Sequence, residues 1–331
     1  MTKRIALLYG GASSEHDVSV MGYEYVSELL RDTEYEIVPV YISKSGGWSV
    51  MNDGVPIAAY LTAKGGGSLN TEYGLIKIDA AIPLLHGDGG EDGSVQGALE
   101  CARIPYVGAD VSTSALCLDK AYSKAVADSL GIPTVKSVSP RRYESVSSAL
   151  EKCKRELCLP LFIKPRRLGS SLGAGSAASE EEFLKVYEAA SQIGDGLVIV
   201  EERLTEKREL ECAFAQINGK KIVTPPGEIL IGGFYGYGEK YGGKTKTEPL
   251  AKVDVTVRET VMKYSAMLAE AMMLRHLSRI DFFLAKDKIF FNEINTFPGF
   301  TKESLYPKML AECGIDPRDA LISFVKDALC S

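Results

Sequence analysis

Two acidic residues near the end of the chain, Asp281 and Glu293, are placed as metal ligands would be. The segments RIDFFLA and IFFNEIN are apolar runs on either side of residues 286–288, and this pattern predicts an antiparallel hairpin. With residues 286–288 as the turn, Asp281 lies directly opposite Glu293, and Arg279 lies opposite Asn295. Period-two alternation then puts all four side chains on one face. Facing carboxylates repel each other, so we expect a bridging cation. Oxygen ligands favour Mg²⁺ or Mn²⁺, with nucleotide phosphates completing the shell.

This predicted metal site depends on the register of the hairpin. A two-residue turn would shift the pairing by one residue and move the opposed side chains to different faces. A solvated polar face, in which Arg279 alone neutralises the two acids, is the alternative.

A second stretch has the composition of a phosphate-binding loop. The apolar segment LPLFIKP predicts a buried strand that delivers Lys164, and three glycines follow within residues 169–175. Glycine lets the backbone approach a phosphate closely, and Ser170 and Ser171 add hydroxyl groups there. An ordinary polar turn is the alternative. Lys120, in CLDKAYSK, is uninformative by itself.

The octapeptide GEKYGGKT, residues 238–245, fits the G-x-x-x-x-G-K-[ST] pattern of a nucleotide-binding loop. Its surroundings contradict a P-loop, because no apolar strand leads into it and Pro249 prevents a helix from following it. The segment 227–247 is instead predicted to be a long loop, which in a compact domain is usually a lid or a binding loop. A disordered surface loop is the alternative. Lys240 could meet a phosphate when such a lid closes.

Several residues around GLVIVEER could hold a nucleoside. The predicted strand ends beside Glu201, Glu202 and Leu204, where an adenine ring could pair with the backbone. Glu209 could accept hydrogen bonds from ribose hydroxyl groups. Solvated acidic side chains are the alternative.

Three further candidates lie at turns and strand ends. Glu15 lies at the predicted start of a helix, where the helix dipole favours an acidic residue in any case. His86 ends a strand in LLHGDGGEDGS, and ligands of open α/β sheets bind at the carboxyl ends of strands. The turn at 297–299 leaves backbone N–H groups free, including that of Gly299, as an oxyanion site requires.

The elements that must position these residues alternate along the first hundred positions. RIALLYGG, YEIVPVYIS and DAAIPLLHG predict strands, with a short one at IPYVG, and apolar residues at helical spacing between 18 and 29 predict a helix. This alternation is typical of a parallel sheet with helices on both faces. We expect an α/β fold of three units, at residues 1–108, 109–200 and 201–331.

The composition excludes several classes of protein. The chain has 331 residues, 45% of them apolar, and a net charge of −6 with both signs interspersed, which argues against a nucleic-acid partner. No apolar run approaches the length of a membrane span, and the apolar N-terminus ends in Gly-Gly, as a strand does, rather than in a cleavage site. Seven cysteines without a CxxC pair favour a reducing cytoplasm. Three histidines argue against a histidine-built zinc site.

Taken together, these stretches resemble the D-alanine–D-alanine ligases of the ATP-grasp superfamily. The motifs LHGDGGEDGS and NEINTFPGFT are specific in combination, and IALLYGGASSEHDVS, SALCLDKAYSK, FIKPRRLGSSLG, VEERL, GEKY and SRIDFF occur in the order of the family. The resemblance covers nearly the whole chain. It implies three α/β domains with ATP between the second and third.

The resemblance also implies roles for single residues. For ATP it implies that phosphates are held by Lys120, Lys164 and Ser171, the transferred phosphate by Lys240, and the adenosine by Glu201, Glu202, Leu204 and Glu209. For the metals it implies that two Mg²⁺ (or Mn²⁺) ions are bound by Asp281, Glu293 and Asn295. For the reacting groups it implies an oxyanion site at Arg279 and the Gly299 N–H, a hydrogen-bonded set of Glu15, Ser170 and Tyr241, and D-alanine sites lined by His86, Ser304 and Leu305.

Two departures from the family pattern stand out. The chain is one residue longer between Leu204 and Glu209, so the ribose contact could belong to Glu211. The segment PRRLGSSLGAG carries Arg166 and Arg167 where small or apolar residues are commoner.

The implied activity is ligation of two D-alanines for peptidoglycan synthesis, by a cytoplasmic homodimer. ATP would phosphorylate the carboxylate of the first D-alanine, and the amine of the second would attack the acyl phosphate. A D-alanine–D-serine ligase is the main alternative, although the DFF of RIDFF favours D-alanine. Tyr241 argues against D-lactate. A non-catalytic binding module would have broken metal or oxyanion positions, and here the motifs keep all of them.

Overall fold

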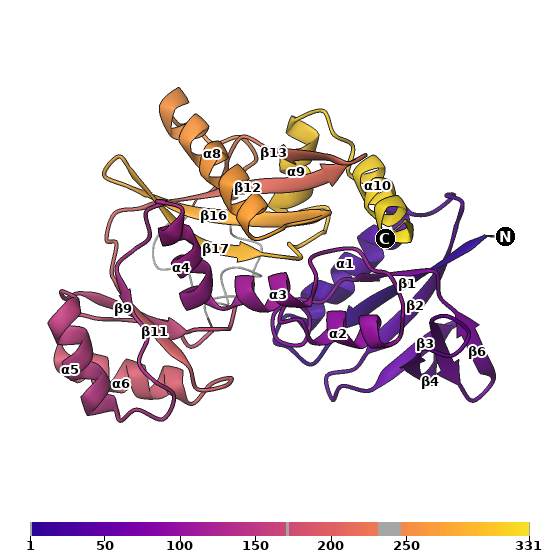
Figure 1. The fold of residues 1–331 in the computed structure, drawn as a ribbon, viewed down its shortest axis with the longest axis horizontal. Helices are drawn as coiled ribbons and strands as arrows, with labels where there is room; N and C mark the ends of the chain where they lie inside the picture. The colour runs from indigo at the N-terminus through magenta and orange to yellow at the C-terminus, as the bar shows by residue number, and fades with distance from the viewer. Residues whose placement is uncertain (1, 170–171, 231–245, 331) are drawn as a thin grey trace.

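The computed structural model describes residues 2–169, 172–230 and 246–330, which form three β-sheets with helices packed on them. In Figure 1 the N-terminal sheet lies on the right, the central sheet at the lower left and the C-terminal sheet across the top. This arrangement confirms the predicted α/β class. Among the described helices, none is long and apolar enough to span a membrane.

The first sheet has a parallel centre and an antiparallel extension, in the order β6-β5-β4-β3-β2-β1-β7. Its strands are β1 (Lys3–Gly10), β2 (Tyr35–Ile42), β3 (Trp48–Asn52), β4 (Val55–Thr62), β5 (Ser68–Thr71), β6 (Gly74–Lys77) and β7 (Ala80–Pro83). β1 is apolar because both of its faces are covered, and alternate residues enter two different core clusters. Helix α1 (His16–Leu29) contributes to one cluster and α2 (Ser94–Cys101) to the other.

The predicted parallel sheet is present in β2, β1 and β7, but residues 48–77 extend it with antiparallel strands. There β3 to β6 form an antiparallel meander, and Asp53 and Gly54 make the turn between β3 and β4 with φ angles of 50° and 81°. Asp-Gly between apolar runs is a hairpin signal, and it was outweighed by the strand–helix alternation around it. The predicted strand at IPYVG is reduced to one bridge, between Ala81 and Tyr106.

The central sheet has the order β10-β9-β11-β8 and carries two helices that share its core. The elements are β8 (Ser137–Val138), α5 (Val146–Glu156), β9 (Leu161–Pro165), β10 (Gly175–Ala177), α6 (Glu180–Ser191) and β11 (Val198–Glu202). Each helix begins at a serine whose hydroxyl accepts a backbone hydrogen bond: Ser145 caps α5 and Ser179 caps α6.

Asp119 joins the helices that precede this sheet, α3 (Val111–Leu118) and α4 (Lys120–Ser129). Its buried carboxylate accepts hydrogen bonds from the N–H groups of Ala121 and Tyr122, at 3.1 and 3.2 Å, and so caps α4. The same carboxylate pairs with Arg166 and Arg167. The two unusual arginines therefore anchor the start of the glycine-rich loop to α4.

The C-terminal sheet has the order β15-β14-β12-β16-β17, with β13 paired to β12. Its elements are β12 (Arg208–Ile217), β13 (Lys220–Val223), β14 (Gly227–Leu230), β15 (Lys246–Glu248), α8 (Val255–Ala271), β16 (Leu277–Ala285), β17 (Lys288–Asn295), α9 (Leu305–Glu312) and α10 (Pro317–Leu329). Residues of α8 pack in one core cluster with β12 and β16, whereas α9 and α10 share a cluster with β1 and β7. Figure 1 shows α10 beside the N-terminal strands. The core cluster of α9, α10, β1 and β7 contains residues of both the first and the last predicted unit. The division into three units therefore stays a prediction.

The hairpin of β16 and β17 pairs Asp281 with Glu293 as predicted, although the predicted turn was wrong. The turn has two residues, Lys286 and Asp287, with φ angles of 46° and 62°, so Ala285 faces Lys288. A β-bulge next to Asp281 then shifts the register back by one residue.

The inserted residue of this bulge is Asn292, because Phe282 pairs with Phe291 and Asp281 with Glu293. A regular strand would send one of two consecutive residues into the core. The bulge instead lets Asn292 and Glu293 both line the same cleft, while Ile294 returns to the core.

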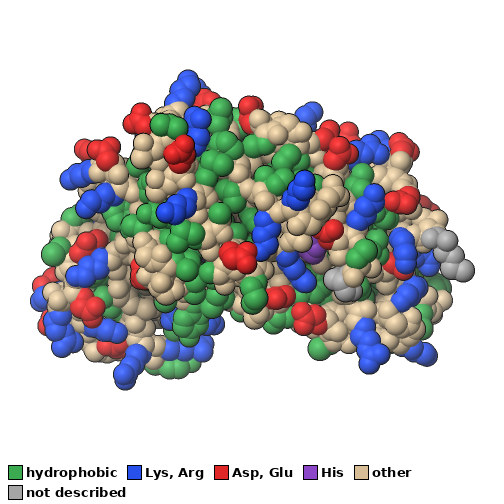
Figure 2. Space-filling view, turned by 45° about the horizontal axis from the view of Figure 1, so that its top comes forward, with side chains coloured by type: hydrophobic (Ala, Val, Ile, Leu, Met, Phe, Trp, Pro, Cys, Tyr) green, Lys and Arg blue, Asp and Glu red, His purple; other side chains and the backbone are tan. Residues whose placement is uncertain are grey.

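The predicted loop 227–247 is shorter than expected. Residues 227–230 and 246–248 pair as strands β14 and β15, because both segments extend the edge of the C-terminal sheet. Ser170, Ser171, Lys240 and Tyr241 lie outside the described residues. Figure 2 shows acidic and basic side chains interspersed over the face that it displays.

Candidate active site

Two clefts meet in the middle of the molecule. The first, of about 440 Å³, lies between the central sheet and β12, β16 and β17. The second, of about 850 Å³, lies between the start of α1, the loop after β7 and the segment that joins β17 to α9. The two clefts share the residues Lys120, Gly169, Glu211, Ile229, Arg279 and Glu293. Their junction is therefore lined by two cationic and two anionic side chains, together with Gly169 and Ile229.

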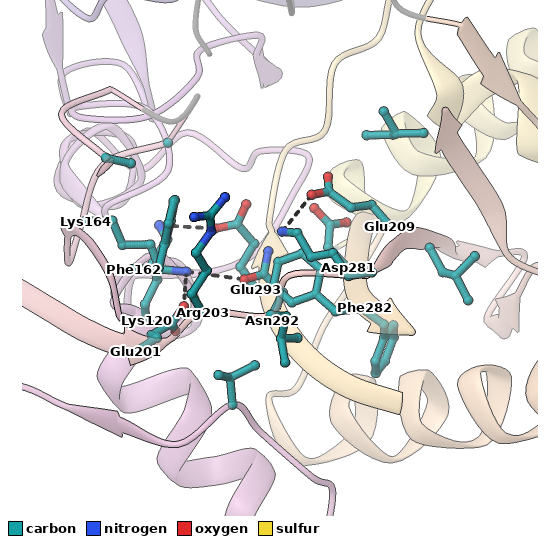
Figure 3. Close-up of a pocket in the computed structure, with 18 of the residues that line it drawn as sticks. Lys120, Phe162, Lys164, Glu201, Arg203, Glu209, Asp281, Phe282, Asn292 and Glu293 are labelled. Carbon is teal, nitrogen blue, oxygen red and sulfur yellow. Dashed lines mark hydrogen bonds and ion pairs between the residues drawn. The ribbon is translucent and has the colours of Figure 1, made fainter. Parts of the chain in front are cut away.

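Two predicted phosphate ligands, Lys120 and Lys164, reach the first cleft from α4 and β9. The Lys120 ammonium lies 3.1 Å from a Glu293 carboxylate oxygen and donates to the Leu168 carbonyl at 2.8 Å. The Lys164 ammonium lies 2.9 Å from a Glu201 oxygen and 3.4 Å from the Asn292 amide oxygen. Figure 3 shows both lysines converging on the same space.

Arg279 lies at the junction between three acceptors. Its guanidinium donates to both oxygens of Asp281, at 2.8 and 2.7 Å, and lies 3.1 Å from Glu211. Burial alone would lower the pKa of Arg279, but Asp281 and Glu211 raise it well above its ordinary value. The Asn295 amide also donates to Asp281, at 3.0 Å. The predicted face of Arg279, Asp281 and Asn295 thus exists.

The donor atoms on this face fit a hard divalent cation. Asp281, Glu293 and Asn295 offer carboxylate and amide oxygens, which are the ligands that magnesium and manganese prefer. Within the described ranges, no group of three or more His, Cys, Asp and Glu side chains is placed to hold a metal. Two carboxylates and an amide would thus need further oxygen ligands, such as those of phosphate groups.

The residues predicted to hold the nucleoside line the first cleft. Their side chains differ in accessibility and in the protein groups with which they already interact. Glu201 is buried and pairs with two lysines. The Glu202 carboxylate accepts from the Cys158 N–H at 3.3 Å. Glu209 is the more accessible of the two ribose candidates and pairs with Lys207 at 2.9 Å, whereas Glu211 is committed to Arg279. This difference favours Glu209 for the ribose.

The second cleft contains the residues predicted to bind the amino acid. His86 is buried, and its Nδ1 lies 3.1 Å from the Phe297 carbonyl oxygen. Burial lowers the pKa of His86, which favours a neutral ring that donates to this carbonyl. Glu15 is the N-cap residue of α1, but its side chain makes no capping hydrogen bond. Its carboxylate lies beside Gly87 and Gly169, where an added Cβ would be 3.1 and 3.4 Å away.

The turn at residues 297–299, which is predicted to hold an oxyanion, and the start of α9 form the opposite wall. A Cβ on Gly299 would lie 3.1 Å from the Ser304 hydroxyl oxygen, so a larger residue here would push the Ser304 side chain aside. The Ser304 hydroxyl accepts from the Thr301 N–H at 3.1 Å, and Leu305 is buried beside it.

Sequence reasoning missed Glu91, which holds the two walls together. Its two carboxylate oxygens accept from the N–H groups of Gly87 and Phe297, both at 3.0 Å. The motif GEDG contains Glu91, but no spacing rule in the sequence distinguishes a structural bridge from a solvated acid.

Glu91 makes the stability of the protein depend on pH. Burial raises its pKa to about 7 from an ordinary 4.5, against the two backbone hydrogen bonds that lower it. The folded state therefore binds the proton more tightly than the unfolded state, and the stabilisation present below pH 4.5 is lost as pH rises through 7. We expect the unfolding free energy of the wild type minus that of Glu91→Gln to fall by about 3 kcal/mol over this range. Denaturant unfolding at a series of pH values measures it, and a constant difference would contradict the assignment.

Comparisons with known proteins agree with this geometry. Residues 4–109 match the family model described as D-ala D-ala ligase N-terminus, and residues 126–326 match the one described as D-ala D-ala ligase C-terminus. The D-alanine–D-alanine ligase of Oceanobacillus iheyensis is 33% identical over 99% of this chain and 96% of its own length. The crystal structure of D-alanyl-alanine synthetase A from Vibrio cholerae has a TM-score of 0.90 at 34% identity, and covers 100% of both chains.

A second solved structure, the VanG D-Ala:D-Ser ligase from Enterococcus faecalis, has a TM-score of 0.89 at 32% identity and covers 99% of this chain and 100% of its own. The resemblance inferred from the motifs is therefore confirmed over the whole length. The chain belongs to the D-alanine–D-alanine ligase family of ATP-dependent ligases, and its fold is the ATP-grasp fold of that family.

Proposed function

We propose that this chain joins two D-alanine molecules to D-alanyl-D-alanine and converts ATP to ADP and phosphate, with the terminal phosphoryl group passing through an acyl phosphate of the first D-alanine. The observation that supports this most directly is the shared junction of the two clefts. A carboxylate bound in the second cleft and a terminal phosphate bound in the first would meet between Lys120, Arg279 and Glu293. Holding two reactants at one point supplies a large part of the rate of such reactions.

The residues of the junction suit phosphoryl transfer followed by acyl transfer. Lys120 and Lys164 would hold phosphate oxygens, and Arg279 with the Gly299 N–H would stabilise the oxyanion formed when the second amine attacks the acyl phosphate. Asp281, Glu293 and Asn295 would hold magnesium or manganese ions, two per site, which neutralise phosphate charge when bound. Glu201, Glu202, Leu204 and Glu209 would contact the adenosine.

The remaining roles follow from the family resemblance. Ser171 and Lys240 would contact phosphates, and Tyr241 would join Glu15 and Ser170 near the amino groups of the substrates. In the second cleft, His86, Ser304 and Leu305 would line the D-alanine sites. We also propose a homodimer in the cytoplasm, where ATP is available and the seven cysteines stay free, as they are here.

The second substrate is the point that the experiment must decide, because a D-Ala:D-Ser ligase is similar to this chain at nearly the same TM-score. Phosphate release from ATP is measured with D-alanine alone, with D-alanine plus D-serine, and with D-alanine plus D-lactate, and the dipeptides are identified by mass. We expect D-alanine alone to support full turnover. Faster turnover with D-serine as the second substrate, or no turnover with D-alanine alone, would reject the proposal.

Removal of divalent metal should stop the reaction. With EDTA present, we expect turnover to fall by at least about 10³-fold, because only the lysines then remain to neutralise the phosphate charge. Added Mg²⁺ should restore it. Turnover that continues in EDTA would contradict the metal assignment of Asp281, Glu293 and Asn295.

A further inference from the structure

Lys124 is a buried lysine that belongs to neither cleft. It lies on α4, is 3% exposed, and is absent from the described residues that line the two clefts. Its ammonium donates to the Val135 carbonyl at 3.1 Å and forms an ion pair with Glu201. Burying a charge costs free energy unless it is paired, so this lysine depends on its partner.

Glu201 connects Lys124 to the first cleft. One carboxylate oxygen contacts Lys124 and the other lies 2.9 Å from the Lys164 ammonium. Lys164 and Glu201 line the cleft, whereas the buried Lys124, on α4, contacts Glu201 without lining the cleft. In Figure 3, Lys164 lies between Glu201 and Asn292. The three residues therefore form a continuous Lys–Glu–Lys row from the interior to the cleft.

The net charge of this row determines how strongly the first cleft attracts a phosphate group. Glu201 is ionised: burial would raise its pKa, but Lys124 and Lys164 together hold it at about 2. Lys164 and Glu201 by themselves would form a neutral pair, with little attraction for an anion. Burial lowers the pKa of Lys124, against the ion pair with Glu201, which raises it. With a protonated Lys124 the row carries one net positive charge, and Lys164 is its only cation that faces the cleft.

We propose that Lys124 is a positioning residue for nucleotide binding. Its ammonium pairs with Glu201 and neutralises the negative charge of that carboxylate, so that the positive charge of Lys164 stays available to attract the phosphates. Lys124 touches no substrate and acts through Glu201. The inference rests on the proposed function only in that the first cleft binds ATP.

The test compares ATP with adenosine, which lacks phosphates. Binding of each is measured by calorimetry with Mg²⁺ and without D-alanine, and the readout is the ratio of the two dissociation constants. In Lys124→Met the row becomes neutral, so we expect ATP to bind about tenfold or more weakly while adenosine changes little. A purely structural role predicts that both ligands weaken equally, and that result would overturn the proposal, as would an unchanged ratio.

A double variant separates charge from packing. Lys124→Met combined with Glu201→Gln removes one positive and one negative charge, so Lys164 again carries one net charge. We expect the ratio to return to within about threefold of the wild type. Any direct contact of Glu201 with adenine affects both ligands and cancels in the ratio. A double variant as impaired as the single one would contradict the proposal.

Two further variants keep the test decisive. If Lys124→Met does not fold, Lys124→Arg and the double variant both retain the net charge, and a tenfold change in either ratio overturns the proposal. Lys152→Met, on α5, removes a lysine that donates to the Ser139 carbonyl and should leave the ratio unchanged. Because no D-alanine is present, a protein that binds ATP but forms no dipeptide would contradict the proposed function without affecting this result.

Discussion

Glu293→Gln is expected to lower kcat by a factor of about 10² to 10³ while the protein folds normally. Glu293 lies at the junction of both clefts, 3.1 Å from the Lys120 ammonium. Glutamine keeps the size of the side chain but removes its charge, so a bound cation loses one anionic ligand. Steady-state phosphate release with ATP and D-alanine measures the effect, together with a thermal unfolding curve.

A matched control tests whether a loss of activity in Glu293→Gln comes from removing charge at that position. Glu270→Gln removes another ion-paired glutamate, which lies on α8, pairs with Lys221 and has a side chain that is 76% exposed. We expect its kcat to stay within about twofold of the wild type, as for most surface substitutions. Activity near wild type in Glu293→Gln would reject Glu293 as a metal ligand.

Arg279→Lys is expected to lower kcat by about 10³-fold, the upper range for losing oxyanion donors. The lysine keeps a positive charge beside Asp281 and Glu211, so the two carboxylates are not left uncompensated. It cannot reproduce the forked contact with both Asp281 oxygens while also facing a substrate. Lost hydrogen bonds should reduce the unfolding free energy by only about 1–3 kcal/mol.

The control for Arg279 is Arg208, which makes a similar forked contact outside the clefts. Arg208 donates to both oxygens of Glu228, at 2.7 and 2.6 Å. Arg208→Lys should change stability by a similar or smaller amount and leave kcat nearly unaltered. If both variants lose activity in proportion to their loss of stability, Arg279 has no special role in the reaction.

The sequence predicted the facing of Asp281 and Glu293 correctly but the turn between their strands wrongly. The pairing of Asp281 with Glu293 was derived from a three-residue turn that does not exist, and it holds because the bulge at Asn292 compensates for the shorter turn. Period-two reasoning has no means of detecting a bulge, since the inserted residue obeys no apolar pattern. The choice of face was nevertheless right, because Phe282 and Ile294 fix which side is core.

Contacts between distant segments could not be predicted from the sequence for a different reason. Glu91 and Lys124 are ordinary charged residues in their local context, and only the fold reveals that they bridge Gly87 to Phe297 and Val135 to Glu201. Lys120, by contrast, became interpretable through the family resemblance, although its own surroundings in the sequence were uninformative.

The position of α10 has a consequence for how the protein is made. Its residues Phe324 and Val325 lie in the same core cluster as Ile5 and Leu7 of β1, and Arg318 donates to the Arg31 carbonyl at 2.9 Å. A ribosome releases residues 317–329 long after β1 and α1 have emerged, so one apolar face of the N-terminal sheet stays only partly covered, by α1, until α10 arrives. Nascent chains stalled before residue 317 should therefore recruit chaperones through that sheet.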